Sequence, residues 1–344
     1  MATTPVRLAA ILALLLVLSA CGGGQEPDAP DAAATDGGGD AAEDDVSTEG
    51  LRVAYASDLD PNDIADQLGL REAGAEIVIL TEDSAVVAGL RQNEFQIGNI
   101  DLTAAIKAIQ GGVPLKIVYV AQNTPEFVMV AQSDITELSQ LEGKTVAYHS
   151  PGSLTEILQR ELIRENVPEL EDEIDWTVLP ESPNRAAAML AGRIHATTLE
   201  FLDVYALQQE GDFNVLGDWG DLSGDSAAAI ATAWVVTEDY LAEERDTVQA
   251  FLEHIQAGYD TFYEDKEAWL SLATETLPDV DEAALQEAYD YYVDVEMYPT
   301  GDEPPITEER WAGLDGFFRQ IGEYEQEAPI DMVDMEMVAA IAGG

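Results

Sequence analysis

The sequence predicts an α/β fold for the chain from Leu51 onward. Short apolar runs alternate with segments whose apolar residues recur at helical spacing, and this alternation is typical of strands and helices that pack in layers. After Glu238 the short apolar runs stop, and helical patterns continue alone to the C-terminus. A helical C-terminal segment is therefore expected. The predicted strands cover residues 51–56, 75–80, 95–100, 115–121, 127–132, 145–150, 175–180, 195–200, 213–218 and 228–237.

The first 20 residues predict an export signal. Arg7 precedes an apolar run over residues 8–18, and the run ends in the small residues of "LSAC". The run is about half of the roughly 20 residues that a membrane span needs, so a signal peptide is favoured over a span. "LSAC" followed by glycines resembles a bacterial lipobox, which implies that Cys21 becomes the lipid-modified first residue of the mature chain. An ordinary secretory signal with a chance cysteine is the alternative.

Residues 21–50 predict a disordered, acidic tether. They consist largely of Gly, Ala, Pro, Asp and Glu, so they have little apolar surface to bury. Cys21 is the only cysteine, which excludes a disulfide within the chain. The remaining body is long enough for one large lobe or two moderate lobes.

The charge of the chain is extreme. It carries 68 acidic and 15 basic residues, for a net charge of −53, and the excess is spread along the whole body. A uniformly negative surface repels nucleic acid and anionic lipid headgroups, so a nucleic-acid-binding role is excluded. We interpret the acidity as a halophile-like adaptation to high salt. Because acids occur everywhere, a single carboxylate is weak evidence for a site.

Two segments repeat one pattern, which favours two related lobes. Residues 85–101 ("AVVAGLRQNEFQIGNID") and residues 184–200 ("NRAAAMLAGRIHATTLE") each predict a helix, a turn and a short strand. The strands end in Asp101 and Glu200. Ligands of open α/β sheets bind beyond the carboxyl ends of strands, so two lobes would place both acids at a shared cleft. The alternative is that helix–turn–strand units recur in every α/β protein.

Several segments together resemble ABC-importer substrate-binding proteins, in the branch for nitrate, sulfonate, taurine and thiamine-pyrimidine precursors. The most specific segment is "LEGKTVAYHSPGS", a strand followed by a Gly/Ser turn and a helix. The other segments, in family order, are "LRVAYASDLD", "GLREAGAEIVIL", "LRQNEFQIGNID", "GGVPLKIVYV", "AAAMLAGRIHATTLE", "TEDYLAEERDTVQAFLEHI" and the closing "APIDMVDMEMVAAIAG". The resemblance covers nearly all of residues 51–344.

This resemblance implies the type II periplasmic-binding-protein fold. That fold has two α/β lobes, two hinge crossovers and a ligand in the cleft between the lobes. After the signal at residues 1–20 and the tether at 21–50, lobe I is expected at residues 51–124 plus 228–344. Lobe II is expected at residues 125–227.

The loop after the first strand departs from the family pattern. "DLDPNDIADQLGL" stands where the family has an apolar helix start that carries an aromatic residue. "DLDPND" superficially resembles a calcium loop, but Asp63 replaces the glycine and Gly69 replaces the glutamate that such a loop needs. The resemblance still implies ligand contact at this loop, so Asp58 and Asp60 remain candidates.

The turn "HSPGSLTE" (149–156) is neither a phosphate loop nor a nucleophile elbow. It lacks the GxxxxGK[ST] run of the first and the trailing glycine of the second. What remains is a helix N-terminus with free N–H groups and a cap from Ser150 or Ser153. Such an end can bind a polar ligand group, and the resemblance implies that the turn lines the cleft.

Strand ends and crossovers supply the other candidates. No Arg stands at a predicted strand end, and the carboxylates of Asp101 and Glu200 favour an amine, an amidine or an aminopyrimidine over an oxyanion. "AQNTPE" (121–126) is expected to cross between the lobes, and "AIATAWVV" (229–236) to return. The predicted ligand-binding residues are Asp58, Asp60, Ser84, Asn99, Asp101, Gln122, Asn123, His149, Ser150, Gly152, Ser153, Thr155, Glu200, Tyr205, Thr232 and Trp234.

Taken together, these observations predict a lipoprotein that delivers a small nutrient to an ABC permease and ATPase. The nutrient is an N-heterocycle of the thiamine-precursor type, an amine or a sulfonate, and the protein is a monomer on the outer side of the bacterial cell membrane. No cofactor, metal or catalytic residue is expected, since His149, His195 and His254 have no metal-ligand spacing. The alternatives are a sensor lipoprotein on the same fold and an enzyme related to pyrimidine-precursor synthases.

Overall fold

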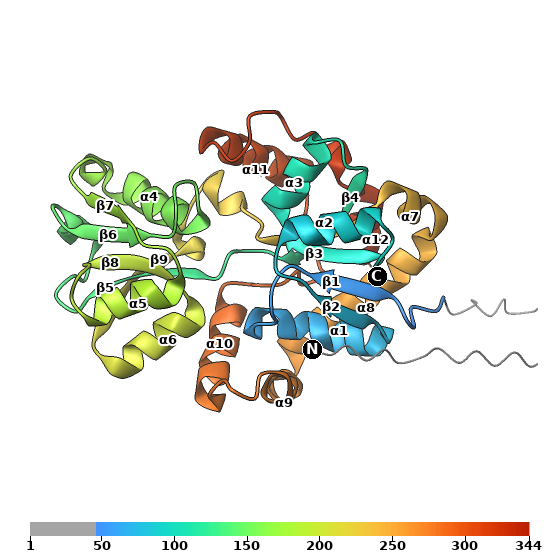
Figure 1. Cartoon of the computed structure of the whole chain (residues 1–344), viewed down its shortest axis with the longest axis horizontal. Helices are drawn as coiled ribbons and strands as arrows, with labels where there is room; N and C mark the ends of the chain where they lie inside the picture. The colour runs from blue at the N-terminus through green and yellow to red at the C-terminus, as the bar shows by residue number, and fades with distance from the viewer. Residues whose placement is uncertain (1–45, 344) are drawn as a thin grey trace, which may run out of the picture. The chain divides into compact units, whose positions relative to one another are not determined.

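The computed structural model describes residues 46–343, which form two mixed five-stranded sheets flanked by helices (Figure 1). The predicted α/β fold with two lobes is thereby confirmed. The signal, Cys21 and most of the tether lie outside the described residues. Thr48 is buried and its hydroxyl donates to the carbonyl of Ala73 (2.8 Å), so the packed body already includes residues before Leu51.

The sheet of lobe I has the strand order β2-β1-β3-β10-β4. Three strands run parallel, and β10 runs antiparallel to both β3 and β4. Helices α1 and α2 lie on opposite faces of this sheet, where α8 packs beside α1 and α3 packs beside α2 (Figure 1). The strands are β1 (Arg52–Tyr55), β2 (Glu76–Ile79), β3 (Ile97–Asp101), β4 (Leu115–Gln122) and β10 (Thr232–Thr237). The helices named here are α1 (Ile64–Ala73), α2 (Asp83–Arg91), α3 (Leu102–Gln110) and α8 (Arg245–Glu264).

Lobe II repeats this arrangement with the order β7-β6-β8-β5-β9. Again three neighbouring strands, β7, β6 and β8, pair in parallel. Strand β5 lies between β8 and β9 and runs antiparallel to both. The two segments that share a sequence pattern, α2–β3 and α5–β8, therefore hold the same place in their sheets. The strands are β5 (Phe127–Gln132), β6 (Thr145–Tyr148), β7 (Asp175–Val178), β8 (Ala196–Glu200) and β9 (Phe213–Asp218). The helices are α4 (Leu154–Asn166), α5 (Ser182–Leu190) and α6 (Phe201–Glu210).

The chain after β10 is helical, as predicted. Its amphipathic helices bury aromatic residues against lobe I, and Phe251, Phe262 and Trp269 are fully buried. Among the described residues, no helix is both long enough and apolar enough to cross a membrane. The helices are α7 (Glu238–Glu243), α8, α9 (Lys266–Thr276), α10 (Glu282–Asp294), α11 (Glu308–Gln320) and α12 (Met335–Ile341).

One guanidinium joins the two crossovers between the lobes. Arg310 of α11 donates to the side-chain and backbone oxygens of Asn123 (both 3.0 Å) in the first crossover. It also donates to the carbonyls of Ala228 (3.3 Å) and Ala229 (3.4 Å) in the second. A fifth bond reaches Pro305 (2.8 Å). No carboxylate of the described chain pairs with this cation, and burial lowers the pKa of Arg310 to about 10.

Removing this guanidinium should destabilise the protein. Arg310→Ala leaves carbonyls of both crossovers without their donor, and we expect the free energy of unfolding in urea to fall by about 2–4 kcal/mol. Arg71→Ala is the control, because the Arg71–Glu275 ion pair is exposed to solvent and should contribute little to stability. Equal effects of the two substitutions would contradict the role of Arg310.

Candidate ligand-binding cleft between the lobes

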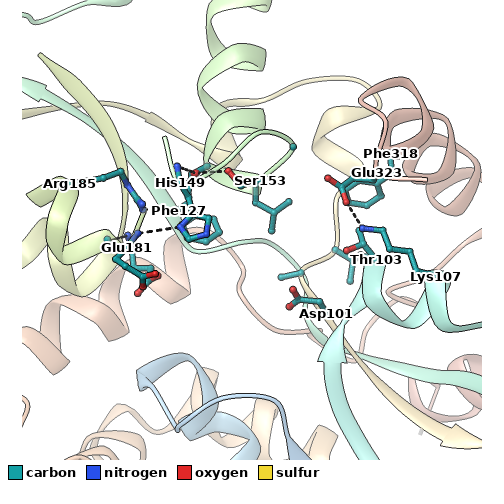
Figure 2. A pocket seen from close by; sticks show the side chains of 17 residues that line it. Asp101, Thr103, Lys107, Phe127, His149, Ser153, Glu181, Arg185, Phe318 and Glu323 are labelled. Carbon is teal, nitrogen blue, oxygen red and sulfur yellow. Dashed lines mark hydrogen bonds and ion pairs between the residues drawn. The ribbon is translucent and has the colours of Figure 1, made fainter. Parts of the chain in front are cut away.

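Two adjoining pockets lie between the lobes. The first, of about 430 Å³, is lined by both acidic and basic side chains, and we call it the mixed pocket (Figure 2). The second, of about 330 Å³, is lined by acidic and neutral side chains, and we call it the acidic pocket. Both pockets share Asp101, Phe127, Leu154, Glu200 and Ala231, so they form one continuous cleft.

The strand ends of both sheets meet at this cleft. Asp101 ends β3 and pairs with Thr232, the first residue of β10. Glu200 ends β8 and pairs with Phe127, the first residue of β5. Because β5 and β10 each enter from a crossover, both acids are held next to the hinge. The shared sequence pattern of the two lobes thus has a geometric consequence: it supplies one carboxylate from each side of the cleft.

Six carboxylates line the acidic pocket, and no Lys, Arg or His does. Burial raises the pKa of Asp63 to about 7, and burial with the charge of Asp83 raises the pKa of Asp101 to about 7. Burial also raises the pKa of Glu126 to about 8, against the hydrogen bond that Tyr292 donates (2.7 Å). Burying like charges disfavours their ionised forms, and a cation in the pocket would reverse this. The six are Asp60, Asp63, Asp83, Asp101, Glu126 and Glu200.

Within the cleft, basic side chains line only the mixed pocket. Lys107 of lobe I is held by Glu323 (2.7 Å), at the edge opposite His149 and Arg185 in Figure 2. Arg185 is buried, with 1% of its surface exposed, and donates to the carbonyls of Thr198 (2.9 Å) and Leu179 (3.3 Å). These cations are therefore engaged within the protein.

The turn before α4 uses its hydroxyls locally. The hydroxyl of Ser153 caps the helix by accepting from the N–H of Glu156 (3.4 Å). The hydroxyl of Thr155 accepts from the backbone N–H of His149 (3.0 Å). The imidazole Nδ1 of His149 accepts from the N–H of Glu181 (3.3 Å), as Figure 2 shows. The residues of this turn therefore have two roles, because they cap α4 and also line the cleft.

Comparison with known families decides the classification. The family described as NMT1/THI5 like matches residues 64–268, more than half of the chain. The chain belongs to the NMT1/THI5-like family. No curated protein matches this NMT1/THI5-like chain.

Solved structures share its fold at low sequence identity. The periplasmic aliphatic sulphonate binding protein SsuA from Escherichia coli is 18% identical, with a TM-score of 0.63 over 83% of this chain and 91% of that one. A zinc-bound ligand-binding component of an ABC-type import system from Staphylococcus aureus is 14% identical, with a TM-score of 0.63 over 85% and 98%. The desulfurization enzyme DSZB has the same four values as the S. aureus protein. The predicted two-lobe periplasmic-binding-protein fold is confirmed.

Most of the predicted ligand-binding residues come together in the cleft of the NMT1/THI5-like chain. They are drawn from four places: the loop after β1, the ends of β3 and β8, the two crossovers, and the turn before α4. Those that line one or both pockets are Asp60, Asn99, Asp101, Gln122, His149, Gly152, Ser153, Thr155, Glu200 and Thr232.

The structure places the other predicted residues outside both pockets. Trp234 is fully buried in the core of lobe I, where its indole N–H donates to the hydroxyl of Tyr259 (3.1 Å). The side chain of Asn123 bonds to Arg310 at the hinge, and Tyr205 lies on α6 without lining either pocket. Three further residues are also outside: Asp58, Ser84 and Ser150.

Sequence reasoning missed several cleft residues of this family member. Glu126 directly precedes β5, and Asp83 begins α2, but in so acidic a chain neither carboxylate stood out. Arg185 reaches the mixed pocket from the first turns of α5 rather than from a strand end. A lone Arg within an Ala-rich helix of an acidic chain was the signal that could have revealed it.

The raised pKa values predict that this NMT1/THI5-like protein loses stability as pH rises. Asp63, Asp101 and Glu126 hold protons in the folded state that they release in the unfolded state, since unfolded carboxyls titrate near pH 4. The folded state therefore binds more protons between about pH 4 and pH 8, and its stability falls through that window. We expect Tm without ligand to fall from pH 5.5 to pH 8.5 at constant ionic strength.

The variant Glu126→Gln measures the effect of this one buried carboxyl separately from the repulsion among all the acidic residues of the chain. The amide still accepts from Tyr292 but cannot ionise, so Tm at pH 8.5 should rise by about 2–5 °C and its fall with pH should be shallower. The exposed Glu303→Gln is the matched control. An identical pH slope in Glu126→Gln and the wild type would refute the assignment.

Proposed function

We propose that this chain is an extracytoplasmic, lipid-anchored binding protein that captures a small organic cation between its lobes and presents it to an ABC importer. Family membership, the two-lobe fold and a cleft that spans the hinge support this proposal. Lobe I would comprise residues 51–124 plus 228–344, and lobe II residues 125–227. Closure about the hinge would enclose the ligand.

The acidic pocket is the observation that carries the choice of a cation. Six carboxylates face a space of about 330 Å³ without a basic partner in its lining. A sulfonate or nitrate would enter that space against their repulsion, whereas an amine or amidinium would form charge-assisted hydrogen bonds with them. The cationic groups of the mixed pocket do not reverse this preference, because Lys107 is paired with Glu323 (2.7 Å).

We propose binding without chemical change. A shared fold does not carry a shared activity, so the likeness to a desulfurization enzyme concerns architecture alone. The synthases that the sequence resembles depend on a cysteine-rich segment, whereas the only cysteine here is Cys21. Turnover of a captured solute during incubation would revive the enzyme alternative. Absence of permease and ATPase genes beside the gene would favour the sensor alternative.

Neutralising the two strand-end acids should weaken binding. Asp101→Asn and Glu200→Gln each remove one negative charge from the cleft, and we expect each to lower the affinity for a cationic solute by about tenfold. Mass spectrometry of the solute that co-purifies with the protein identifies the ligand, and isothermal titration calorimetry measures its affinity. Asp58→Asn, outside both pockets, is the control. A ligand set confined to nitrate or alkylsulfonates would overturn the proposal.

The lipid anchor is tested separately. Cys21→Ser should move the protein from the membrane fraction to the culture or periplasmic fluid, because the acylated side chain is replaced by a hydroxyl. Fractionation followed by immunoblotting measures the distribution, with a conservative change in the tether, Gln25→Asn, as the control. Equal membrane association of Cys21→Ser and the control would rule out an anchor at Cys21.

A further inference from the structure

The neutral walls of the acidic pocket also present acceptors, and we propose that its ligand is a cation bearing several N–H donors, such as a guanidinium, an amidinium or a primary polyamine. This inference rests on the proposed function and narrows it. It excludes alkylated ammonium compounds and metal ions as the principal ligands. Two buried amides that line the pocket beside its six carboxylates carry the argument.

Asn99 is the first of these amides. Its side chain is 5% exposed and lines the acidic pocket, and its Nδ2 donates to the carboxylate of Asp66 (3.0 Å). Among the described residues, its Oδ1 has no hydrogen-bond partner. Since the nitrogen faces the core, the oxygen is the atom left for a ligand.

Asp66 favours this orientation of Asn99. It is fully buried and also accepts from the hydroxyls of Tyr55 (3.0 Å) and Tyr259 (2.7 Å). Burial raises the pKa of Asp66, and the three bonds donated to it oppose that rise. A reversed amide would set its oxygen against the Asp66 oxygens, so the core of lobe I determines the polarity of the pocket wall. Asp66 is a positioning residue in this sense.

Gln122 is the second amide and repeats the arrangement from the first crossover. It is 7% exposed and lines the same pocket, and its Nε2 donates to the carbonyl of Asn62 (3.2 Å). No group in residues 46–343 bonds to its Oε1. The buried hydroxyl of Thr232, which also lacks a partner in the described chain, can accept or donate. Ser57 and Asn62 also line the pocket and can donate as well as accept, so the acceptor character of this wall comes from the Asn99 and Gln122 oxygens together with the carboxylates.

Other cations fit this wall poorly. A quaternary ammonium ion needs several aromatic faces, but only Tyr55 and Phe127 contribute rings, and the hydroxyl of Tyr55 is bound to Asp66. Within the described part of the chain, no cluster of three or more His, Cys, Asp or Glu side chains is arranged to hold a metal ion. A cation with several N–H groups can instead pair with carboxylates and neutral oxygens at once, and a guanidinium can also stack on Phe127.

The test compares six probes on the full chain by thermal shift and calorimetry at equal ionic strength: agmatine, putrescine, choline, MgCl₂, taurine and sodium nitrate. We expect agmatine or putrescine to bind at least about tenfold more tightly than choline. Tighter binding of choline or Mg²⁺ overturns this inference but leaves the proposed cation-binding function standing. Binding of taurine or nitrate with no response to any cation overturns both.

Variants at the two amides test the mechanism. Gln122→Met removes the oxygen at nearly constant volume and should reduce the agmatine-to-choline affinity ratio by about tenfold. Asn99→Leu should act in the same direction, and Ser84→Ala, outside both pockets, should leave the ratio unchanged. If Asn99→Leu fails to fold because Asp66 loses a donor, Gln122→Met alone decides. A folded Gln122→Met protein with the wild-type ratio refutes the inference.

Discussion

The structure depends on the antiparallel insertion of one strand into each parallel sheet. β5 enters lobe II from the first crossover and pairs with β8, and β10 enters lobe I from the second and pairs with β3. This pairing ties each hinge strand to a strand whose last residue is an acid. The hinge, Asp101 and Glu200 are consequently neighbours because of backbone hydrogen bonds, and Arg310 then joins the two crossovers by donating to oxygens of both.

The proposed preference of the cleft for cations comes at a cost in stability. Burial and the neighbouring negative charges raise the pKa values of these carboxyls, so ionising them in the acidic pocket costs more free energy than ionising the same groups on a solvated surface. A cationic ligand would neutralise those charges. The free energy lost to their repulsion without ligand would then be regained on binding and would increase the affinity. Burial of aromatic residues around α8 and α9 and the hydrogen bonds to Asp66 supply the rigidity that holds the acids in place.

Much of the architecture could be predicted because strands and helices follow from local patterns of apolar residues. Apolar runs marked each strand to within a few residues, and the repeat at residues 85–101 and 184–200 anticipated two sheets of one topology. The acids at the ends of that repeat do line the cleft. Aromatic residues were harder, since Trp234 lies on a crossover strand but turns into the core of lobe I. A strand has two faces, and the sequence of one strand does not say which face meets the other lobe.

The sequence by itself determined the order and type of the elements, the two-lobe class and the acidic character, because these follow from periodicity and composition. Only the tertiary structure decided which of the 68 acids share a pocket, which amide oxygens face it and which cations are already engaged. Those outcomes depend on pairs such as Asn99 with Asp66 and Arg310 with Asn123, which are far apart in the chain. A hydrogen bond between residues far apart in the chain produces no periodic pattern in the sequence. It could therefore be identified only from the tertiary structure, in which the folded sheets bring its two partners together.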